Sequence, residues 1–364
     1  MIQTAADNGY MSRALQLARK GLYTTDPNPR VGCVIVKDGE IVGEGWHERA
    51  GEPHAEVHAL HAAGDKAVGA TVYVTLEPCC HHGKTPPCSE ALIKAHVGRV
   101  VVAMQDPHSR VAGKGLQQLR DAGIEVEVGV LESQAQALNP GFIRRMQTGR
   151  PYVRNKLAMS LDGRTAMASG ESKWITSAAA REDVQRLRAR SSAIVTGVGT
   201  VLADDPSMTV RLEGIERQPV RVVVDTHLSM PVTARMLQQP GRTLVMTCSD
   251  DEAAREALEQ AGAEVIVLPF CSDTVDMQAV LDALGEMEIN EVLVESGATL
   301  SGAMLQAGLI DELVIYMAPI VMGDGARGLF RLPELQTMEQ KINLDITDMR
   351  AVGIDWRITA SVTR

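Results

Sequence analysis

The sequence predicts two consecutive α/β domains. Its 364 residues exceed the length of most single domains. In both halves, short apolar runs typical of strands alternate with longer segments of helical periodicity, which is the pattern of α/β domains. Turn residues mark the ends of the polar segment 133–150, which contains Asn139-Pro140-Gly141 and Gly149-Arg150-Pro151. We therefore predict domains at 1–146 and 147–364.

Composition and charge limit the possible functions. The net charge of −10 argues against a nucleic-acid-binding protein, because phosphate binding needs a basic surface. Of the six cysteines, three cluster between residues 79 and 88 and three stand singly, which is typical of a reduced compartment and not of a disulfide framework. We find neither a signal peptide nor an apolar run of membrane-spanning length. We expect a soluble cytoplasmic protein.

The elements of the first half follow from periodicity and turn residues. Residues 5–21 have helical spacing, with Met11, Leu15 and Ala18 on one face. Asp38-Gly39 between two apolar runs predicts a β-hairpin. The expected elements after the first helix are strands at 31–36 and 41–45, a helix at 54–63, a strand at 70–76, a helix at 89–95, a strand at 99–104, a helix at 115–122 and a strand at 124–128.

The second half continues the alternation. A helix at 177–190 is predicted to be capped by Ser177 or Thr176. Strands are expected at 152–158, 192–196, 220–224, 243–246, 264–268, 291–295 and 312–318, with helical patterns between several of them. The residues after about Leu332 contain no motif that predicts a role.

One histidine, one glutamate and two cysteines form a candidate zinc site in the first half. His54, Cys79 and Cys88 are ligands of the kind that zinc prefers, and three of them leave a fourth position for water. Glu56 stands two residues after His54, and Cys79 follows Pro78 after a predicted strand. His-x-Glu followed by Pro-Cys and a second cysteine is the signature of zinc-dependent nucleobase deaminases, in which the glutamate moves protons and does not bind the metal.

Other interpretations of these residues remain open. Cys80, His81 and His82 could complete a structural zinc site with four protein ligands, and paired cysteines could form a redox pair. A catalytic site is favoured over these alternatives because Glu56 stands two residues after His54 and because Pro78-Cys79 follows a predicted strand. A catalytic site predicts that Glu56→Gln abolishes deamination with zinc retained, whereas a zinc-stabilised scaffold would be unaffected.

The spacing of the cysteines departs from the common two residues of the superfamily. Eight residues separate Cys79 from Cys88, so they are expected to bulge as a loop, for which Gly83 and two prolines are suited. This insertion and its Thr-Pro-Pro-Cys ending resemble the pyrimidine deaminase of riboflavin biosynthesis. The resemblance implies a cytidine-deaminase-like three-layer domain with three helices around a small mixed sheet. It also implies a substrate contact for Asn28, which could otherwise be a turn residue between two prolines.

The second half lacks the Gly-x-Gly-x-x-Gly fingerprint of dinucleotide-binding domains. Two transitions from strand to glycine, at 196–200 and 295–302, could place helix amides against a phosphate, although such glycines more often form only a turn. Together with segments 156–163, 172–177 and 204–206, they resemble the reductase domain of riboflavin biosynthesis. The resemblance implies a dihydrofolate-reductase-like α/β domain that uses NADPH.

The reductase resemblance also implies roles for individual residues. The implied NADPH-binding residues are Ala158, Trp174, Thr200, Asp204, Thr226, Gly297, Ala298, Thr299, Leu300, Ser301, Gly302 and Ala303. The implied residues for the phosphorylated substrate are Ser172, Arg188, Met208, Arg211 and Glu295. Arginine forks suit phosphate, but Arg188 could instead belong to a solvated helix face and Trp174 to a core. Met208 is expected to act through its backbone or through packing.

Both domains in one chain, deaminase first, resemble the bifunctional deaminase–reductases of riboflavin biosynthesis. The resemblance implies Zn²⁺ and NADPH as cofactors. It implies hydrolytic deamination of 2,5-diamino-6-(5-phosphoribosylamino)pyrimidin-4-one, then reduction of the ribose of 5-amino-6-(5-phosphoribosylamino)uracil to ribityl phosphate. It also implies a homodimer or homotetramer. The net charge argues against a nucleic-acid partner, and the lack of a membrane-spanning apolar run argues against a membrane partner. The alternative is a deaminase of tRNA or free nucleosides, which the net charge and the motifs of the second half disfavour.

Overall fold

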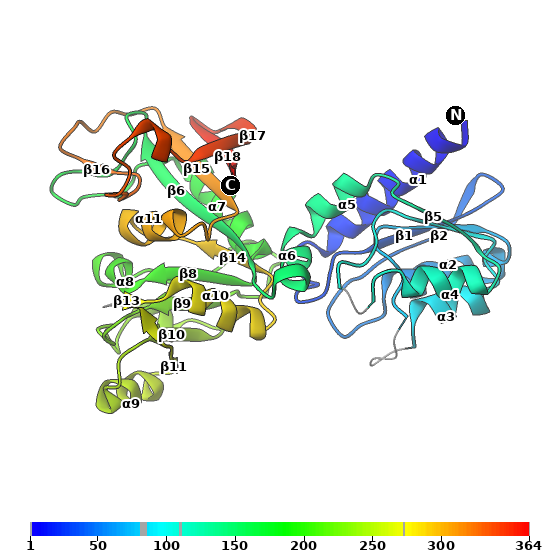
Figure 1. Ribbon diagram of the computed structural model, residues 1–364, viewed down its shortest axis with the longest axis horizontal. Coiled ribbons are helices and arrows are strands. Elements are labelled where there is room, and N and C mark those ends of the chain that lie inside the picture. Colours follow the sequence, from blue (N-terminus) through cyan, green and yellow to red (C-terminus); the bar gives the residue numbers. More distant parts are fainter. Residues whose placement is uncertain (1, 81–85, 109–110, 272–273, 364) are drawn as a thin grey trace. The chain divides into compact units, whose positions relative to one another are not determined.

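The chain divides after Gly149 into two units, Met1–Gly149 (unit 1) and Arg150–Arg364 (unit 2) (Figure 1). The computed structural model describes residues 2–80, 86–108, 111–271 and 274–363. In these ranges, no helix combines the length and the apolar character that crossing a membrane requires. The domain boundary that we expected after residue 146 lies inside the last helix of unit 1.

The polar segment that was expected to join the domains is helical. It forms α5 (Glu132–Leu138) and α6 (Pro140–Thr148). Pro140 stands in the first turn of α6, where its missing N–H has no helical partner to lose, and Gly149 ends the helix with a φ of 77°. Apolar side chains of both helices pack into the core of unit 1, which explains why the segment folds.

Unit 1 is built on a five-stranded sheet with the strand order β2-β1-β3-β4-β5. β1 pairs antiparallel with β2 and β3, whereas β3, β4 and β5 run parallel. The predicted hairpin is present, and Asp38 and Gly39 have the positive φ values, 51° and 84°, that its tight turn requires. The strands are β1 (Gly32–Lys37), β2 (Glu40–Trp46), β3 (Thr71–Val74), β4 (Arg99–Val102) and β5 (Glu125–Val128).

Helices cover both faces of this sheet, so the predicted three-layer architecture of unit 1 is confirmed (Figure 1). α2, α3 and α4 enclose one buried apolar cluster with the sheet, and α1 and α5 enclose another. The helices not yet given are α1 (Ile2–Ala18), α2 (Ala55–Ala63), α3 (Cys88–Lys94) and α4 (Lys114–Asp121), with 3-10 turns η1 (Arg19–Gly21) and η2 (Gly64–Ala67).

Unit 2 contains a nine-stranded sheet with the order β11-β10-β9-β8-β14-β6-β15-β18-β17. Its strands run parallel from β11 to β15, and only β18 and β17 are antiparallel to their neighbours. The strands are β6 (Tyr152–Ser160), β8 (Ala193–Gly197), β9 (Val220–Val224), β10 (Thr243–Thr247), β11 (Glu264–Val267), β14 (Glu291–Val294), β15 (Glu312–Ala318), β17 (Asn343–Val352) and β18 (Asp355–Thr363). Two small sheets pair β7 (Arg164–Ala166) with β16 (Arg327–Gly328), and β12 (Phe270–Cys271) with β13 (Thr274–Val275).

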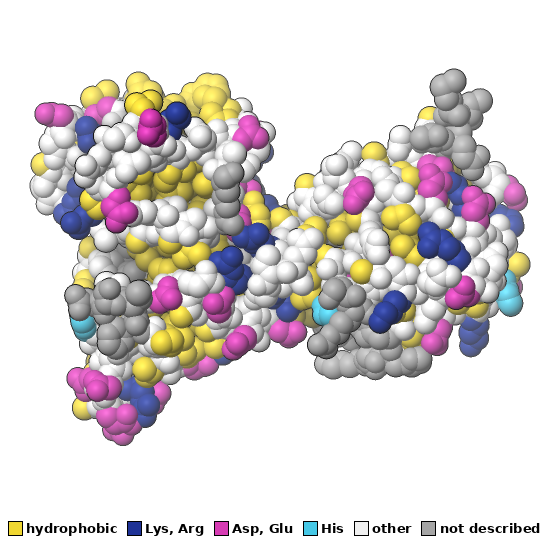
Figure 2. All heavy atoms as spheres, viewed as in Figure 1, with side chains coloured by type: hydrophobic (Ala, Val, Ile, Leu, Met, Phe, Trp, Pro, Cys, Tyr) yellow, Lys and Arg dark blue, Asp and Glu magenta, His cyan; other side chains and the backbone are white. Residues whose placement is uncertain are grey.

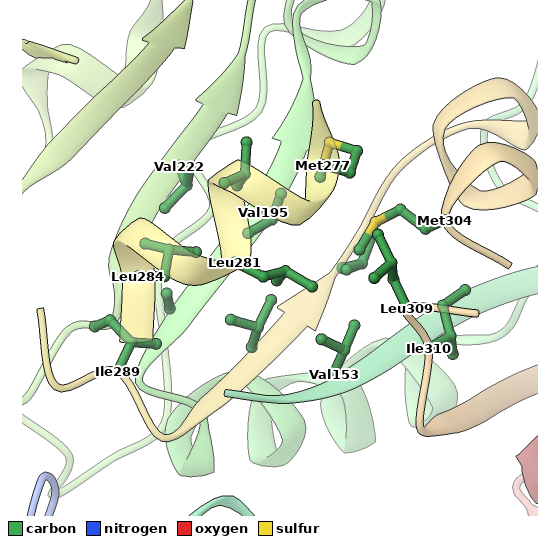
Figure 3. Close-up of a cluster of buried hydrophobic side chains, with 14 of the residues drawn as sticks. Val153, Val195, Val222, Met277, Leu281, Leu284, Ile289, Met304, Leu309 and Ile310 are labelled. Carbon is green, nitrogen blue, oxygen red and sulfur yellow. The ribbon is translucent and has the colours of Figure 1, made fainter. Parts of the chain in front are cut away.

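Helices cover both faces of the nine-stranded sheet, so the prediction of a second α/β domain is confirmed. α10 and α11 pack on one face, where Met277, Leu281 and Met304 lie in the larger core cluster (Figure 3). α7, α8 and α9 pack on the other face through residues such as Leu187 and Leu258. The elements are α7 (Ala178–Arg190), α8 (Val198–Asp204), α9 (Glu252–Gln260), α10 (Met277–Glu286), α11 (Ala298–Gln306), η3 (Arg235–Gln238) and η4 (Met338–Gln340).

Candidate active sites

The three predicted zinc ligands converge in unit 1. His54 is the N-cap residue of α2, Cys79 follows β3, and Cys88 is the first residue of α3. One ligand atom from each residue lies within 4.8 Å of the other two. Among the described residues, this is the one group of histidine, cysteine or carboxylate side chains close enough to hold a metal ion, and Cys80 is not part of it.

The spacing of these atoms fits zinc. Nδ1 of His54 lies 3.6 Å from Sγ of Cys79 and 3.3 Å from Sγ of Cys88. Tetrahedral zinc with ordinary bond lengths separates a nitrogen and a sulfur ligand by about 3.6 Å. The three residues therefore suit one zinc ion, and among the described residues no fourth protein ligand lies beside them. The alternative of a structural site with His81 and His82, and the loop expected between the cysteines, involve residues 81–85, which lie outside the described residues.

The electrostatics of the cluster favour a thiolate. Cys79 forms hydrogen bonds with Cys88 and His54, and these lower its pKa to about 4, although burial opposes the shift. The hydrogen bond to Cys79, together with burial, raises the pKa of Cys88. In this pair of thiols, Cys88 therefore keeps the shared proton. A hydrogen bond to Cys79 also raises the pKa of His54. Such a cluster releases a proton when a cation binds, as thiolate ligands do.

Glu56 is placed to move protons beside this cluster. It lies in the first turn of α2, and its residue is 3% exposed. Burial raises the pKa of its carboxyl group to about 7, although His54 opposes the shift. A group with a pKa near neutrality is well suited to take up and return a proton at neutral pH.

Asn28 is connected to His54, one of the proposed zinc ligands, by His47, a residue that the sequence did not single out. Its Nδ2 is 3.0 Å from Nε2 of His47, whose Nδ1 lies 3.1 Å from the carbonyl oxygen of Pro53. The ring of His47 contacts the ring of His54 edge-on, with 5.3 Å between their centroids. His47 is buried in the fold. In the sequence it is marked only by its place directly after the return strand of the hairpin, which does not indicate a contact with Asn28 or His54.

The second candidate site lies at the carboxyl ends of β6, β8, β9 and β14. These strands run parallel, so their carboxyl ends meet at one edge of the sheet, where α/β proteins commonly bind ligands. Ala158 lies near the end of β6, Thr226 follows β9, and Glu295 follows β14. α8, which carries Thr200 and Asp204, starts directly after β8. The fold thus brings those of the predicted residues that lie near the end of β6 or follow β8, β9 and β14 to one edge.

The segment Gly297–Ala303 forms the start of α11, with Gly297 as its N-cap residue. Backbone amides at a helix start favour a phosphate group. The backbone of Arg331 packs closely against this helix: its N–H donates to the carbonyl of Ala298 at 3.0 Å, and a Cβ at Gly302 would lie 2.3 Å from its carbonyl oxygen. Gly302 is therefore required by packing, independently of any ligand.

Trp174 and Asp204 are connected through Lys173. Nζ of Lys173 lies 2.9 Å from Oδ1 of Asp204. Trp174 is 71% exposed, and the guanidinium carbon of Arg181 lies 4.6 Å from the centre of its ring. The alternative that Trp174 belongs to a core is therefore wrong. An exposed indole in a cationic setting is available to stack on a flat ligand.

Arg188 and Glu295 form a bidentate ion pair. Nε of Arg188 lies 2.6 Å from Oε1 of Glu295, and its Nη2 lies 3.0 Å from Oε2. Both side chains are 13% exposed, so the alternative of Arg188 on a solvated helix face is wrong. Burial would raise the pKa of Glu295, but Arg188, Lys156 and Arg211 together hold it below the usual value. Lys156 had no role assigned from the sequence, and burial lowers its pKa although Glu295 opposes the shift.

The remaining predicted substrate and cofactor residues are less closely connected. Met208 lies in the second core cluster of unit 2 and has a φ of 49°, so a contact with substrate would come from its backbone. Arg211 is exposed, and its N–H donates to Gln185 at 3.0 Å. Ser172 and Thr226 are half-buried, and the carbonyl of Thr226 accepts a hydrogen bond from the hydroxyl of Thr247.

Comparison with known families agrees with this pair of sites. Residues 4–104 match the family described as the cytidine and deoxycytidylate deaminase zinc-binding region. Residues 151–358 match the family described as the RibD C-terminal domain. Each match lies within one unit and includes the candidate site of that unit.

Relatives and solved structures match nearly the whole chain. The riboflavin biosynthesis protein RibD of Escherichia coli is 53% identical over 361 residues, which cover 96% of this chain and 97% of that protein. RibD of Acinetobacter baumannii is 48% identical with a TM-score of 0.93, covering 99% of this chain and 100% of that one. The Thermotoga maritima diaminohydroxyphosphoribosylaminopyrimidine deaminase/5-amino-6-(5-phosphoribosylamino)uracil reductase is 35% identical with a TM-score of 0.88, covering 99% of this chain and 100% of that one.

Proposed function

Because the chain belongs to the RibD family of riboflavin-biosynthesis enzymes, we propose that units 1 and 2 act in succession on one phosphoribosylaminopyrimidine. The protein is a bifunctional enzyme, a zinc-dependent deaminase and an NADPH-dependent reductase. The convergence of His54, Cys79 and Cys88 within 4.8 Å carries the assignment of the deaminase site. The proposed substrates are the diaminopyrimidinone and the aminouracil that the sequence resemblance implies.

In unit 1, His54, Cys79 and Cys88 would hold the zinc ion. A zinc ion held there would supply activated water near neutral pH. Glu56 takes up two protons in turn, passing the first to the ring and the second to the departing ammonia, a role that its pKa of about 7 supports. Asn28 and His47, joined by a 3.0 Å contact, would orient the pyrimidine.

In unit 2, the edge of the sheet would hold NADPH and the phosphorylated ribose. NADPH supplies the hydride, so the protein has to bind and orient both molecules. The proposed cofactor-binding residues are Ala158, Trp174, Thr200, Asp204, Thr226, Gly297, Ala298, Thr299, Leu300, Ser301, Gly302 and Ala303. The proposed substrate-binding residues are Ser172, Arg188, Met208, Arg211 and Glu295. The position of Ala158, Thr200, Thr226 and Glu295 near the carboxyl ends of neighbouring parallel strands supports the assignment.

Removal of zinc is expected to separate the two activities. Protein stripped by a chelator, which is then removed, should oxidise no NADPH when it is given the diaminopyrimidinone, because the first step needs the metal. The same protein should oxidise NADPH at the untreated rate with 5-amino-6-(5-phosphoribosylamino)uracil. Added zinc should restore the first reaction. Absorbance of NADPH measures all three rates.

Mock-treated protein is the control for this experiment. Full activity of the stripped protein on the diaminopyrimidinone would contradict a zinc-dependent first step. If the mock-treated protein oxidises no NADPH with either pyrimidine, the assignment of unit 2 is contradicted. Ammonia release from a nucleoside or tRNA, but not from the diaminopyrimidinone, would favour a deaminase of another substrate.

The protein is also proposed to form a homodimer or homotetramer through the hairpin of β17 and β18. Their register places Ile346, Met349 and Trp356 on one face, where they are 59%, 53% and 43% exposed. Hydrophobic side chains reach the surface at several places on unit 2 (Figure 2). β17 is an edge strand, and exposed apolar edges commonly pair with a second chain around a two-fold axis.

Replacing both Ile346 and Met349 with lysine is expected to dissociate the protein to a monomer. Like charges on this face would repel a second copy, and the buried apolar area would be lost. Light scattering after size exclusion at micromolar concentration gives the mass of wild type and variant. Val68→Lys is the control, because Val68 is 54% exposed in unit 1. An unchanged oligomer in the double variant, or a monomeric wild type, would contradict the proposal.

A cytoplasmic location is proposed with this function. The cysteines whose side chains the structure describes are free thiols, at 33, 79, 80, 88 and 248. Free thiols are typical of a reduced compartment. Thiol titration of protein isolated under non-reducing conditions tests this, since disulfides would contradict a reduced location.

A further inference from the structure

We propose that Glu77 and Ser89 are positioning residues that hold Cys79 and Cys88 at the separation zinc requires, by fastening both cysteine segments to helix α4. The inference rests on the zinc site proposed above and deepens it. Neither side chain belongs to the group of three ligand atoms. Each acts through the backbone that carries a ligand.

Glu77 ties the chain before Cys79 to the start of α4. It is 3% exposed, and its carboxylate accepts hydrogen bonds from backbone amides. The donors are the N–H groups of Asp106 at 3.1 Å, Gly113 at 3.0 Å, Gly115 at 2.9 Å and Leu116 at 3.4 Å. A buried carboxylate is costly unless it is hydrogen-bonded, and amides at a helix start favour negative charge. These contacts therefore fix α4 relative to the segment Glu77-Pro78-Cys79.

The approach of α4 to this segment is unusually close. A Cβ at Gly115 would lie 2.1 Å from the carbonyl oxygen of Pro78 and 3.2 Å from Oε1 of Glu77. Only glycine allows the helix to pack directly on the carbonyl group one residue before Cys79. The contact leaves little room for Cys79 to move toward α4.

Ser89 provides the second connection, from Cys79 through α3 to α4. Ser89 is fully buried, and both its N–H and its hydroxyl group donate to the carbonyl oxygen of Cys79, at 3.1 and 3.0 Å. Its Oγ also lies 2.7 Å from Oε1 of Gln118 on α4, so the hydroxyl proton is shared between the two acceptor oxygens. The N–H of Cys88 lies 3.3 Å from Sγ of Cys79. The two ligand segments thus contact each other and the same helix.

The arrangement also settles how the start of α4 is used. The sequence Gly113-Lys114-Gly115 at a helix start could suggest a phosphate cradle. The carboxylate of Glu77 occupies the amides of Gly113 and Gly115, so the anion bound there is part of the protein itself. The helix serves the cysteine segments and not a free phosphate.

Zinc affinity of the full-length chain tests the proposal without reference to activity. Glu77→Gln puts an amide group among the N–H donors, and Ser89→Ala removes the hydroxyl contact but keeps the backbone one. Each is expected to weaken zinc binding about 10–100-fold in competition with a chromophoric chelator, as loss of supporting contacts typically does. The absorption spectrum of the Co²⁺-substituted protein should shift as well, because it reports the geometry of the thiolate ligands.

Glu40→Gln is the matched control, since Glu40 is exposed at the start of β2 in unit 1. Scanning calorimetry shows whether unit 1 of each variant is still folded, which the reductase activity of unit 2 would not report. Wild-type zinc affinity and an unchanged Co²⁺ spectrum in both variants would overturn the proposal. If Glu77→Gln does not fold, the test rests on Ser89→Ala alone. Wild-type zinc affinity of Ser89→Ala would then overturn the proposal. A wild-type chain that binds neither metal would overturn the zinc site as well.

Discussion

Replacement of Glu56 by glutamine is expected to slow deamination by a factor of about 10²–10⁴, the usual contribution of a positioned proton donor and acceptor. Glutamine keeps the shape of the buried side chain but cannot take up and return a proton. His54, Cys79 and Cys88 are unchanged, so the variant should retain zinc. Ammonia release in the absence of NADPH measures the effect, and metal analysis measures the zinc content.

Two comparisons make this result specific. The variant should reduce 5-amino-6-(5-phosphoribosylamino)uracil at the wild-type rate, because unit 2 is unchanged. Glu40→Gln should release ammonia at the wild-type rate, because Glu40 is exposed. Deamination by Glu56→Gln within tenfold of wild type would show that another group moves the protons.

Replacement of Arg188 by methionine is expected to abolish the reductase reaction and to destabilise unit 2 by about 3–5 kcal/mol. The change leaves the carboxylate of Glu295 buried without its bidentate partner, which is more costly than loss of an exposed ion pair. Scanning calorimetry of the full chain measures the stability. The transition of unit 2 is the one that NADPH shifts upward. Ammonia release should be unchanged.

A double variant separates stability from binding. Replacing Arg188 and Glu295 together by methionine is expected to regain much of the stability, because an apolar pair often substitutes well for a buried ion pair. It should not regain reductase activity if the charges bind substrate. Arg186→Met is the control, because Arg186 is 53% exposed on the same helix and should change stability by no more than about 0.5 kcal/mol. A double variant that reduces substrate normally would contradict the proposed role.

The sequence predicted the features that depend on neighbouring residues. Asp38-Gly39 determines its turn by backbone preference, and Ser177 caps α7 by accepting from the N–H of Ala180, as expected. The proposed zinc ligands could be picked out because His54 and Cys88 stand at helix starts and Cys79 follows a strand after a short turn segment. These positions place side chains in a pocket regardless of the distant packing.

Features that depend on distant contacts could not be predicted in this way. α5 and α6 are polar along the chain, and they are stabilised by apolar contacts with a core that the sequence alone does not display. β17 is exposed along nearly its whole length, so it lacks the alternation that indicates a half-buried strand. His47 and Lys156 gain their importance only from residues that folding brings beside them, Asn28 and Glu295.

The exposure of Trp174 gives the protein an optical signal of its own. The chain has three tryptophans, and Trp174, at 71% exposed, is next to Lys173, which pairs with Asp204. Its fluorescence should lie toward longer wavelengths than that of a buried indole. A nicotinamide ring stacked on it would exclude water and absorb the emitted light. Occupancy of the cofactor site could then be followed in solution by light alone, before any substrate is added.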